Sequence, residues 1–382
     1  MKNAINLLYI APILFLSISL YLYNKFKTDK KNTEMLSFYP PKELNSLDTG
    51  FLYKGIANDK DVTSLLLYLA NKGYIKIVKT KYSYGLIKTK EYDGDNINEQ
   101  LFIDRLFTKK RRPNFPLNEN KSGVITSDDL FDNFYITMSR ILSDTNSGKD
   151  KIYEKGTLLA KLFITLMVIL TYCICIITIF PVLSDGNDIG LVMALAFPII
   201  FLYSYINNID TCNNLFAKIC FTLALFVIPW CGLVLPILIN NLFYLLINIY
   251  GLACIVGMII CAKHISKRTK YGDDMLEKIE GLKQFIKLGE KNKILNLLEE
   301  NPNYFYDILP YAYTLNEYDA WIEKFKDINL SFPTWCEDTG DFNLVEFSSF
   351  IKSTMKSVNN SMTSSVVWWR EVLWKNSDFY LL

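Results

Sequence analysis

Two long apolar runs constrain the fold more than any other feature of this sequence. Residues 5–23 hold no charged side chain, and charges are scarce from about residue 157 to residue 262. A helix over residues 5–23 would be about 28 Å long, enough to cross the hydrocarbon core of a bilayer. The rest of the chain is polar and rich in Lys, Asn and Asp. The pattern predicts an α-helical integral membrane protein with soluble parts.

We expect about five spans. Residues 1–23 read as an N-terminal transmembrane anchor, rather than a cleaved signal, because only Lys2 precedes the apolar run and no small-residue cleavage site follows it. Residues 157–262 read as a four-span bundle, divided at Pro181, at "NNIDTCNN" and at Asn240–Asn241. The expected spans there are 157–180, 189–206, 219–239 and 242–262.

Lysines predict the orientation of these spans. Lys25 and Lys27 follow the first span, Lys149 and Lys155 precede the second, and "KHISKRTK" follows the last. Basic residues beside spans stay in the cytoplasm. We therefore expect a multi-pass protein of the cell membrane with its N-terminus outside and residues 24–156 and 263–382 in the cytoplasm.

Composition bears on several function classes. The 41 Lys and Arg nearly balance the 39 Asp and Glu, so no global attraction to nucleic acid follows. The eight cysteines form no C-x-x-C pair and His264 is the single histidine, so we expect no disulfide framework, metal site or cofactor. No nucleophile is evident near His264, and no Asp, Glu, Arg or His lies at mid-depth of a span. We expect no enzyme activity and identify no small-molecule substrate.

Residues 24–156 are typical of a small α+β domain. A helix is expected over 61–74, a hairpin from "YIKIVKT" and "YGLIKTK", and further helices near 97–108 and 127–142. Helix followed by hairpin is the order of a winged-helix module. The helix that would read DNA carries only Lys60 and Lys72, so the favoured role is protein contact or structure, and nucleic acid is an unlikely partner.

A basic cluster in the same region has two interpretations. "KKRRP" is either a solvated loop or a contact with anionic lipid of the inner leaflet. The residues that would make that contact are Lys109, Lys110, Arg111 and Arg112.

The C-terminal region is expected to be a helical cytoplasmic domain over 263–335. Breaks at Gly272, Gly281, Gly289 and Pro302 indicate a compact bundle rather than one rod. Residues 336–382 then read as a polar tail with a Trp-rich end, which would be either an interfacial helix or a poorly ordered segment.

"LPYAYTL" (309–315) and the aromatic residues after it form a distinct cluster. Pro310 is expected to begin a helix, because a first turn tolerates a missing N–H. Tyr311, Tyr318 and Phe325 then share one face, with Trp321 on its edge. We interpret Pro310, Tyr311, Trp321 and Phe325 as a packing or interaction face, with a ligand site as the alternative.

Four segments resemble one known family. They are "YPPKELNSLDTGFL", "DVTSLLLYLANKGYIKI", "KRTKYGDDMLEKIEGLKQFI" and "NYFYDILPYAYTLNEYDAWIEKF". Their order around the spans resembles the membrane and C-terminal part of the YciQ-like bacterial predicted membrane proteins, a family of unknown function. Members commonly have an extracellular β-rich domain before the first span, whereas about four residues precede that span in this sequence. Many members also end in a Gly/Ser-rich tail, where this sequence has the Trp-rich end. The resemblance implies no catalytic residues.

The favoured function is a non-enzymatic scaffold whose cytoplasmic domains bind a protein partner or self-associate, with membrane lipids as the other contact. One alternative is a transporter or channel accessory component, suggested by Pro229 and Pro236 in one span. A second is a membrane-tethered DNA-binding regulator.

Overall fold

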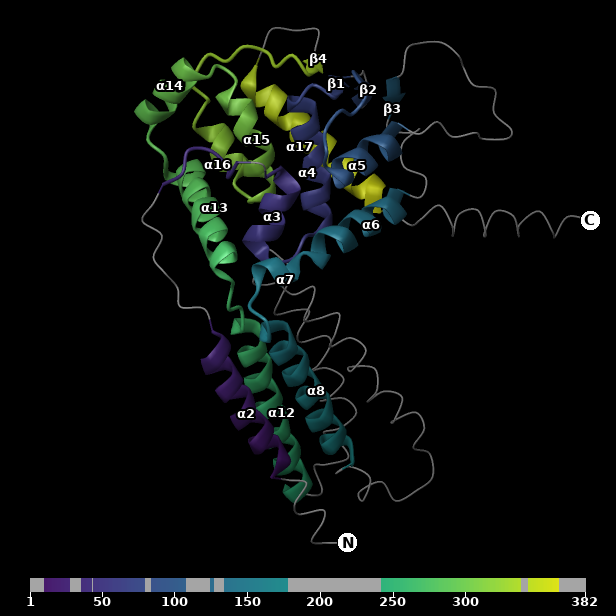
Figure 1. The fold of residues 1–382 in the computed structure, drawn as a ribbon, viewed down its shortest axis with the longest axis vertical. Coiled ribbons are helices and arrows are strands. Elements are labelled where there is room, and N and C mark those ends of the chain that lie inside the picture. The colour runs from purple at the N-terminus through teal and green to yellow at the C-terminus, as the bar shows by residue number, and fades with distance from the viewer. Residues whose placement is uncertain are drawn as a thin grey trace, which may run out of the picture. The chain divides into compact units, whose positions relative to one another are not determined.

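The computed structural model describes residues 10–27, 36–42, 44–79, 84–107, 124–126, 134–177, 242–337 and 343–363. The chain divides into two compact units (Figure 1). The helical unit comprises Met1–Lys30 and Tyr153–Lys267, and the α+β unit comprises Lys31–Ile152 and Arg268–Leu382. Each unit is therefore built from two segments that are distant in sequence.

Three helices make up the described part of the helical unit: α2 (Ala11–Phe26), α8 (Thr157–Ile177) and α12 (Leu242–His264). The stretches Thr157–Cys175 and Leu245–His264 are long and apolar enough to cross a membrane. Helix α2 begins inside the predicted first span and extends beyond the predicted end at residue 23, to Phe26; residues 5–9 of that span lie outside the described residues. The predicted spans 189–206 and 219–239 also lie outside them.

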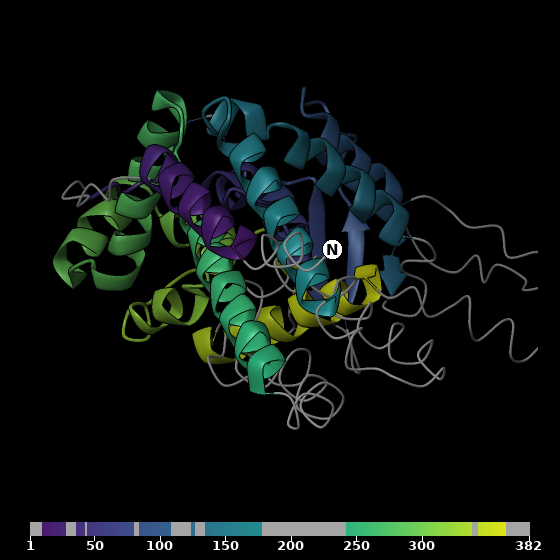
Figure 2. The same ribbon diagram turned by 90° about the horizontal axis from the view of Figure 1, so that it is seen from below.

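Helix α12 packs against both α2 and α8 (Figures 1 and 2). Ile164 of α8 and Met258 of α12 are fully buried in the shared apolar core. Glycine permits the close approach, since a Cβ at Gly257 would lie 2.8 Å from Leu16 Cδ1. The outward faces of the three helices expose large apolar side chains.

The first segment of the α+β unit forms the following elements: α3 (Ser46–Lys54), α4 (Asp59–Asn71), β1 (Ile75–Lys79), β2 (Tyr84–Lys88), α5 (Ile97–Phe107), β3 (Val124–Thr126), α6 (Phe134–Ser147) and α7 (Lys149–Ile152). The second segment forms α13 (Lys270–Leu288), α14 (Lys291–Glu300), α15 (Tyr304–Thr314), α16 (Tyr318–Glu323), β4 (Cys336–Glu337) and α17 (Leu344–Thr363).

Both segments contribute to one four-stranded sheet of order β3-β2-β1-β4. The β1–β2 hairpin is antiparallel, with Ile77 opposite Leu86, as the alternation in the sequence predicts. Strand β4 pairs with β1 in parallel, with Cys336 opposite Ile77, and the N–H of Ile77 donates to the carbonyl of Trp335 at 2.7 Å. This pairing ties the second segment to the first.

Helix α4 lies at the centre of the α+β unit. It packs against α3, α5, α6, α15, α17 and β1. Its apolar face is fully buried, and so are the hydroxyl-bearing Thr63 and Ser64. Asn58 caps its N-terminus through a capping box with Asp61, as the Asn and Asp three residues apart permit.

The segments outside the helical unit differ from the expectation of two domains and a tail. Residues 31–152 and 268–363 pack together, because α15 and α17 both cover α4. Helix α17 lies in the segment expected to be a polar tail. Phe347, Ile351, Met355 and Val358 recur on one face and are buried, while Ser, Asn and Lys occupy the other. The Trp-rich end lies outside the described residues.

Candidate functional site

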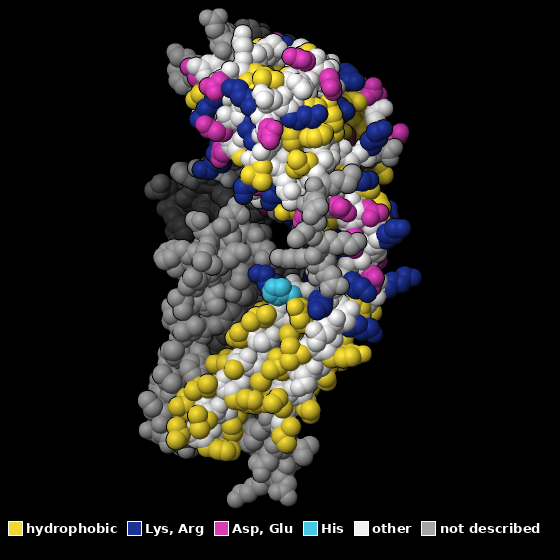
Figure 3. Space-filling view, turned by 90° about the vertical axis from the view of Figure 1, so that its left-hand side faces the viewer, with side chains coloured by type: hydrophobic (Ala, Val, Ile, Leu, Met, Phe, Trp, Pro, Cys, Tyr) yellow, Lys and Arg dark blue, Asp and Glu magenta, His cyan; other side chains and the backbone are white. Residues whose placement is uncertain are grey.

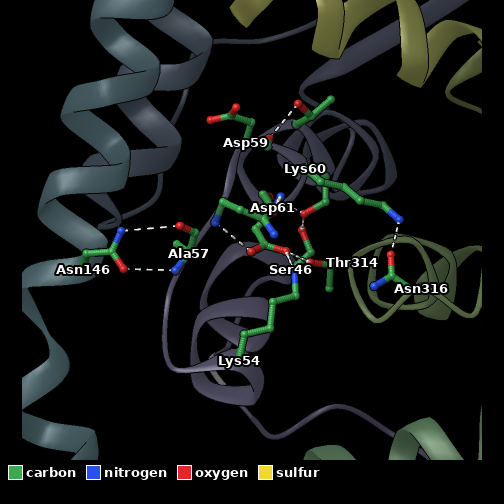
Figure 4. A network of polar contacts seen from close by, with 12 residues as sticks. Ser46, Lys54, Ala57, Asp59, Lys60, Asp61, Asn146, Thr314 and Asn316 are labelled. Atoms are coloured by element: carbon green, nitrogen blue, oxygen red, sulfur yellow. Dashed lines mark hydrogen bonds and ion pairs between the residues drawn. The ribbon is translucent and has the colours of Figure 1, made fainter. Parts of the chain in front are cut away.

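A polar network surrounds Asp61, in the first turn of α4 (Figure 4). Its carboxylate accepts hydrogen bonds from Lys54 Nζ at 2.5 Å, from the N–H of Asn58 at 3.0 Å and from Thr314 Oγ1. These groups come from α3, from the α3–α4 turn and from α15. The side chain of Asp61 is 0% exposed and that of Lys54 is 19% exposed. The network therefore joins the two segments of the unit through a buried charge.

Local sequence explains why the carboxylate fits there. The N-terminus of a helix favours a negative side chain, and Asn58 and Asp61 satisfy each other's backbone N–H groups. Gly50 leaves the space, since a Cβ there would lie 2.5 Å from Asp61 Oδ1 and 2.6 Å from Thr314 Oγ1. The carboxylate is thus fully occupied by protein donors, which favours a structural role over contact with a substrate.

Lys60 continues the network toward the surface. Its Nζ donates to Asn316 Oδ1 at 2.5 Å (Figure 4). The same atom lies 4.7 Å from the ring centroid of Tyr313. Burial, and then the nearby charge of Lys54, lowers the pKa of Lys60. Asn316 has a positive φ of 63°, a conformation that asparagine tolerates better than most residues. On the other side of the network, Asn146 of α6 accepts from the N–H of Ala57 at 3.0 Å.

Three acidic side chains gather near α3: Asp48, Glu99 and Asp144. Burial, and then the charge of Glu99, raises the pKa of Asp48 to about 6. Glu99 accepts from Asn45 Nδ2 at 2.7 Å and from the Tyr92 hydroxyl at 3.0 Å. Within the part of the chain that the structure describes, no group of three His, Cys, Asp or Glu side chains has a geometry that could hold a metal ion.

The predicted start of a helix at Pro310 is wrong. Helix α15 begins at Tyr304, and Pro310 lies well inside it. Proline lacks the N–H that would donate to the carbonyl four residues earlier, so the helix tolerates it at the cost of one hydrogen bond. Pro310 is buried together with the residues around it, and this packing offsets that loss.

The remaining aromatic residues of the cluster are buried. Trp321 is 0% exposed, donates from Nε1 to the carbonyl of Phe305 at 3.1 Å, and its ring centroid lies 4.8 Å from that of Phe325. Tyr311 donates to the carbonyl of Leu44 at 2.8 Å, and burial raises its pKa. The predicted apolar face thus packs against the core and against the chain near residue 44, and a break at Asn316 divides it between α15 and α16.

Arg268 is a structural residue that the sequence did not single out. Its guanidinium is buried and donates to the carbonyls of Leu52 and Tyr53, the latter at 3.0 Å. These carbonyls belong to the last turn of α3, where an α-helix leaves acceptors without partners. In sequence Arg268 is one of several basic residues after a span, and that pattern predicts orientation rather than a helix cap.

The residues that a DNA-binding winged helix would use have other contacts in this structure. Helix α4 is almost completely buried, so it presents no face to a groove. Lysines of the hairpin form ion pairs: Lys76 with Glu337, Lys88 with Glu91 and Lys90 with Asp93. The predicted lipid-contact cluster, Lys109, Lys110, Arg111 and Arg112, lies outside the described residues.

Comparison with known protein families shows which family this chain resembles. No curated protein and no solved structure matches the chain. A family model described as the C-terminal domain of a predicted membrane protein (DUF2207) matches residues 37–325, well over half of the sequence. The match confirms the resemblance to YciQ-like proteins. The chain therefore belongs to the DUF2207 family of predicted membrane proteins, whose function is unknown.

Proposed function

We propose that this protein is a multi-pass, non-enzymatic membrane scaffold that holds its α+β unit in the cytoplasm, where the unit binds a protein partner. Two features support this proposal. The first is that the α+β unit is assembled from the two sequence segments that flank residues 153–267. The second is a group of exposed apolar side chains at the α13–α14 turn.

The assembly of the α+β unit constrains the number of spans. Lys31–Ile152 and Arg268–Leu382 pack into one unit, and two segments that pack together lie on the same side of a bilayer. The chain between them must then cross the membrane an even number of times. Helices α8 and α12 account for two crossings, and the predicted spans 189–206 and 219–239 would bring the number to four. One further crossing by α2 would put the N-terminus on the opposite side.

Labelling from each side of the membrane tests this topology. Single cysteines would replace the exposed Lys356 and Glu91, one in each segment, in a chain whose native cysteines are serines. A membrane-impermeant maleimide should label neither site in intact cells and both after permeabilisation, because basic residues flanking the spans favour the cytoplasm. Labelling of either site in intact cells would overturn the cytoplasmic placement.

The partner-binding part rests on the exposed apolar side chains at the α13–α14 turn. Leu288 is 71% exposed and Leu36 is 49% exposed, and Tyr39 and Leu295 are also exposed. Leu36 and Tyr39 lie next to Phe38 in the sequence, and Leu288 lies three residues after Phe285. The ring centroids of Phe38 and Phe285 lie 4.9 Å apart, which brings these two segments together. Hydrophobic side chains lie among charged ones on this unit's surface (Figure 3). Clustered exposed apolar groups favour protein contact.

Photo-crosslinking in native membranes tests this surface. A benzophenone side chain at Leu288 should give a discrete crosslinked product. The matched control is Val345, an apolar residue of α17 that is 59% exposed and distant in sequence. Equal products from both positions, or none from Leu288, would contradict partner binding at the turn.

The observations favour neither alternative function. Burial of α4 and the ion pairs of the hairpin lysines count against a DNA-binding regulator. Pro229 and Pro236, which suggested a transporter or channel accessory, lie outside the described residues, so that alternative stays a prediction. The winged-helix likeness also stays a prediction, based on the order α4, β1, β2.

A further inference from the structure

One end of the helical unit carries a collar of basic side chains. The C-terminal ends of α2 and α12 meet there with the N-terminal end of α8. The N–H of Lys267 donates to the carbonyl of Phe26 at 3.0 Å, and the N–H of Glu154 donates to the carbonyl of Lys267 at 3.2 Å. The residues from these three ends include the collar lysines Lys25, Lys27, Lys155, Lys263 and Lys267.

The collar lies directly next to the apolar surface. Each helix changes within about one turn from an exposed apolar residue to a lysine: Tyr21 to Lys25, Leu159 to Lys155, and Ile260 to Lys263. Figure 3 shows the histidine and neighbouring Lys and Arg side chains beside the hydrophobic surface. Because α8 spans about 31 Å, close to the hydrocarbon thickness, this boundary falls at the level of the lipid headgroups.

The side-chain position of Lys161 also indicates that this end of the helical unit lies at the level of the lipid headgroups. It lies one turn inside α8, yet its Nζ is 5.7 Å from the ring centroid of Tyr153, which precedes that helix. The side chain therefore extends back toward the collar, as expected of a lysine that snorkels from an apolar helix to the headgroup region.

Helix dipoles explain only part of the collar. Helix dipoles favour a cation at the last turn of α2 and α12, which accounts for Lys25 and Lys263. Lys155 instead precedes the N-terminus of α8, where the dipole disfavours a cation. A carboxylate oxygen of Glu154 lies 3.0 Å from Lys267 Nζ in a half-exposed pair. Among the described residues at this end of the three helices, lysines outnumber carboxylates.

From this placement we infer that the collar binds the phosphate groups of anionic phospholipids in preference to zwitterionic ones. The inference rests on the proposed membrane insertion of the helical unit. A juxtamembrane lysine contributes about 1 kcal/mol of attraction to an anionic lipid surface, and the attraction falls as salt rises. The phosphate groups that the collar binds are thus those of lipids in the surrounding bilayer.

Spin-labelled lipids measure this preference directly. The full chain is reconstituted in phosphatidylcholine bilayers with a trace of spin-labelled phosphatidylglycerol or phosphatidylcholine, and the motionally restricted fraction of each label is compared. We expect the phosphatidylglycerol label to associate several-fold more strongly at low salt. The triple variant Lys25→Gln, Lys27→Gln, Lys155→Gln removes three of the five collar lysines and should lower this ratio clearly, toward one.

Two control variants keep the result interpretable. Lys25→Arg, Lys27→Arg, Lys155→Arg retains the charge and should retain the preference. Lys278→Gln, Lys287→Gln, Lys356→Gln removes the same charge from exposed positions of the α+β unit and should also retain it. A ratio of one in the natural chain, or an unchanged ratio in the collar variant, overturns the inference. A complete lack of restricted lipid of either kind would instead overturn the proposed membrane insertion.

Discussion

At the scale of single residues, Asp61 shows how a local signal acquires a long-range role. The capping box formed by Asn58 and Asp61 is readable in the sequence. The Asp61 carboxylate also accepts a hydrogen bond from Thr314, which lies 253 positions away in the sequence. Neither the hydrophobic periodicity nor the spacing of residues carries information about that pairing. Local chemistry therefore predicts a helix start at this point, whereas only the folded chain reveals a buried ion pair.

Asp61→Ala should lower the free energy of unfolding by about 3–5 kcal/mol, because it leaves the Lys54 ammonium without its partner in a largely buried place. It also removes the acceptor of Thr314 and of the N–H of Asn58. Urea unfolding of the α+β unit, followed in the detergent-solubilised chain, gives the value. Asp59→Ala is the matched control, since Asp59 lies in the same turn and is exposed. Similar losses in both variants would show that helix-dipole effects, and not the ion pair, dominate.

Asp48 predicts a pH dependence. Its pKa of 3.8 in an unstructured chain rises to about 6 in the fold, through burial and then the charge of Glu99. The folded chain therefore holds the proton more tightly. The stabilisation is fully present below about pH 4 and is lost as the pH rises through 6.

Asp48→Asn should accordingly stabilise the protein by roughly 2 kcal/mol at pH 7.5 relative to the natural chain, with little difference at pH 4. Paired urea titrations at the two pH values measure the effect. An equal difference at both pH values would mean that the proton on Asp48 is not the cause.

At the scale of elements, the sequence predicts those whose pattern is local. The apolar face of α4, the alternation of β1 and β2, and the apolar length of α8 and α12 all lie within a few turns of chain. Helix α17 was not predicted because its Ser and Asn content is typical of a tail, although Phe347, Ile351 and Met355 keep helical spacing. Strand β4 was not predicted because two residues are too few to show an alternating pattern, and because its pairing with β1 joins parts of the chain that are distant in sequence.

Substitutions in the aromatic cluster of α15 and α16 test whether this cluster stabilises the fold by packing. Trp321→Ala should lower the free energy of unfolding by about 3–5 kcal/mol, since the indole is fully buried against Phe305 and Phe325. Tyr311→Phe, which removes only the hydrogen bond to the carbonyl of Leu44, should cost about 1 kcal/mol.

Both variants belong in the full chain, because α15 packs on α3 and α4 from the other segment, and an isolated C-terminal fragment would lack that surface. Thermal unfolding is the measurement. A Trp321→Ala protein as stable as the natural chain would contradict the packing role and restore the ligand interpretation.

At the scale of the whole molecule, residues 153–267 of the helical unit interrupt the α+β unit in sequence at one point, between Ile152 and Arg268. The two chain ends at that point are adjacent: the N–H of Thr269 donates to the carbonyl of Ile152 at 2.8 Å, and Thr269 Oγ1 donates to the carbonyl of Lys151 at 2.7 Å. A short linker could therefore join Ile152 directly to Arg268 and leave the α+β unit without the helical unit.

A graft tests this directly. Residues 31–152 joined to residues 268–363 by a Gly/Ser linker of about four residues should give a water-soluble protein that unfolds cooperatively in urea. The reason is that all described elements packed around α4, including α15 and α17, are present in it. A matched graft that ends at residue 337 lacks α17, so it exposes the part of α4 where Thr63 donates to Asn359 at 2.9 Å, and it should aggregate or unfold without a cooperative transition. If the longer graft also lacks a cooperative transition, the α+β unit depends on the helical unit for its fold, and the scaffold must be regarded as one inseparable membrane-bound structure.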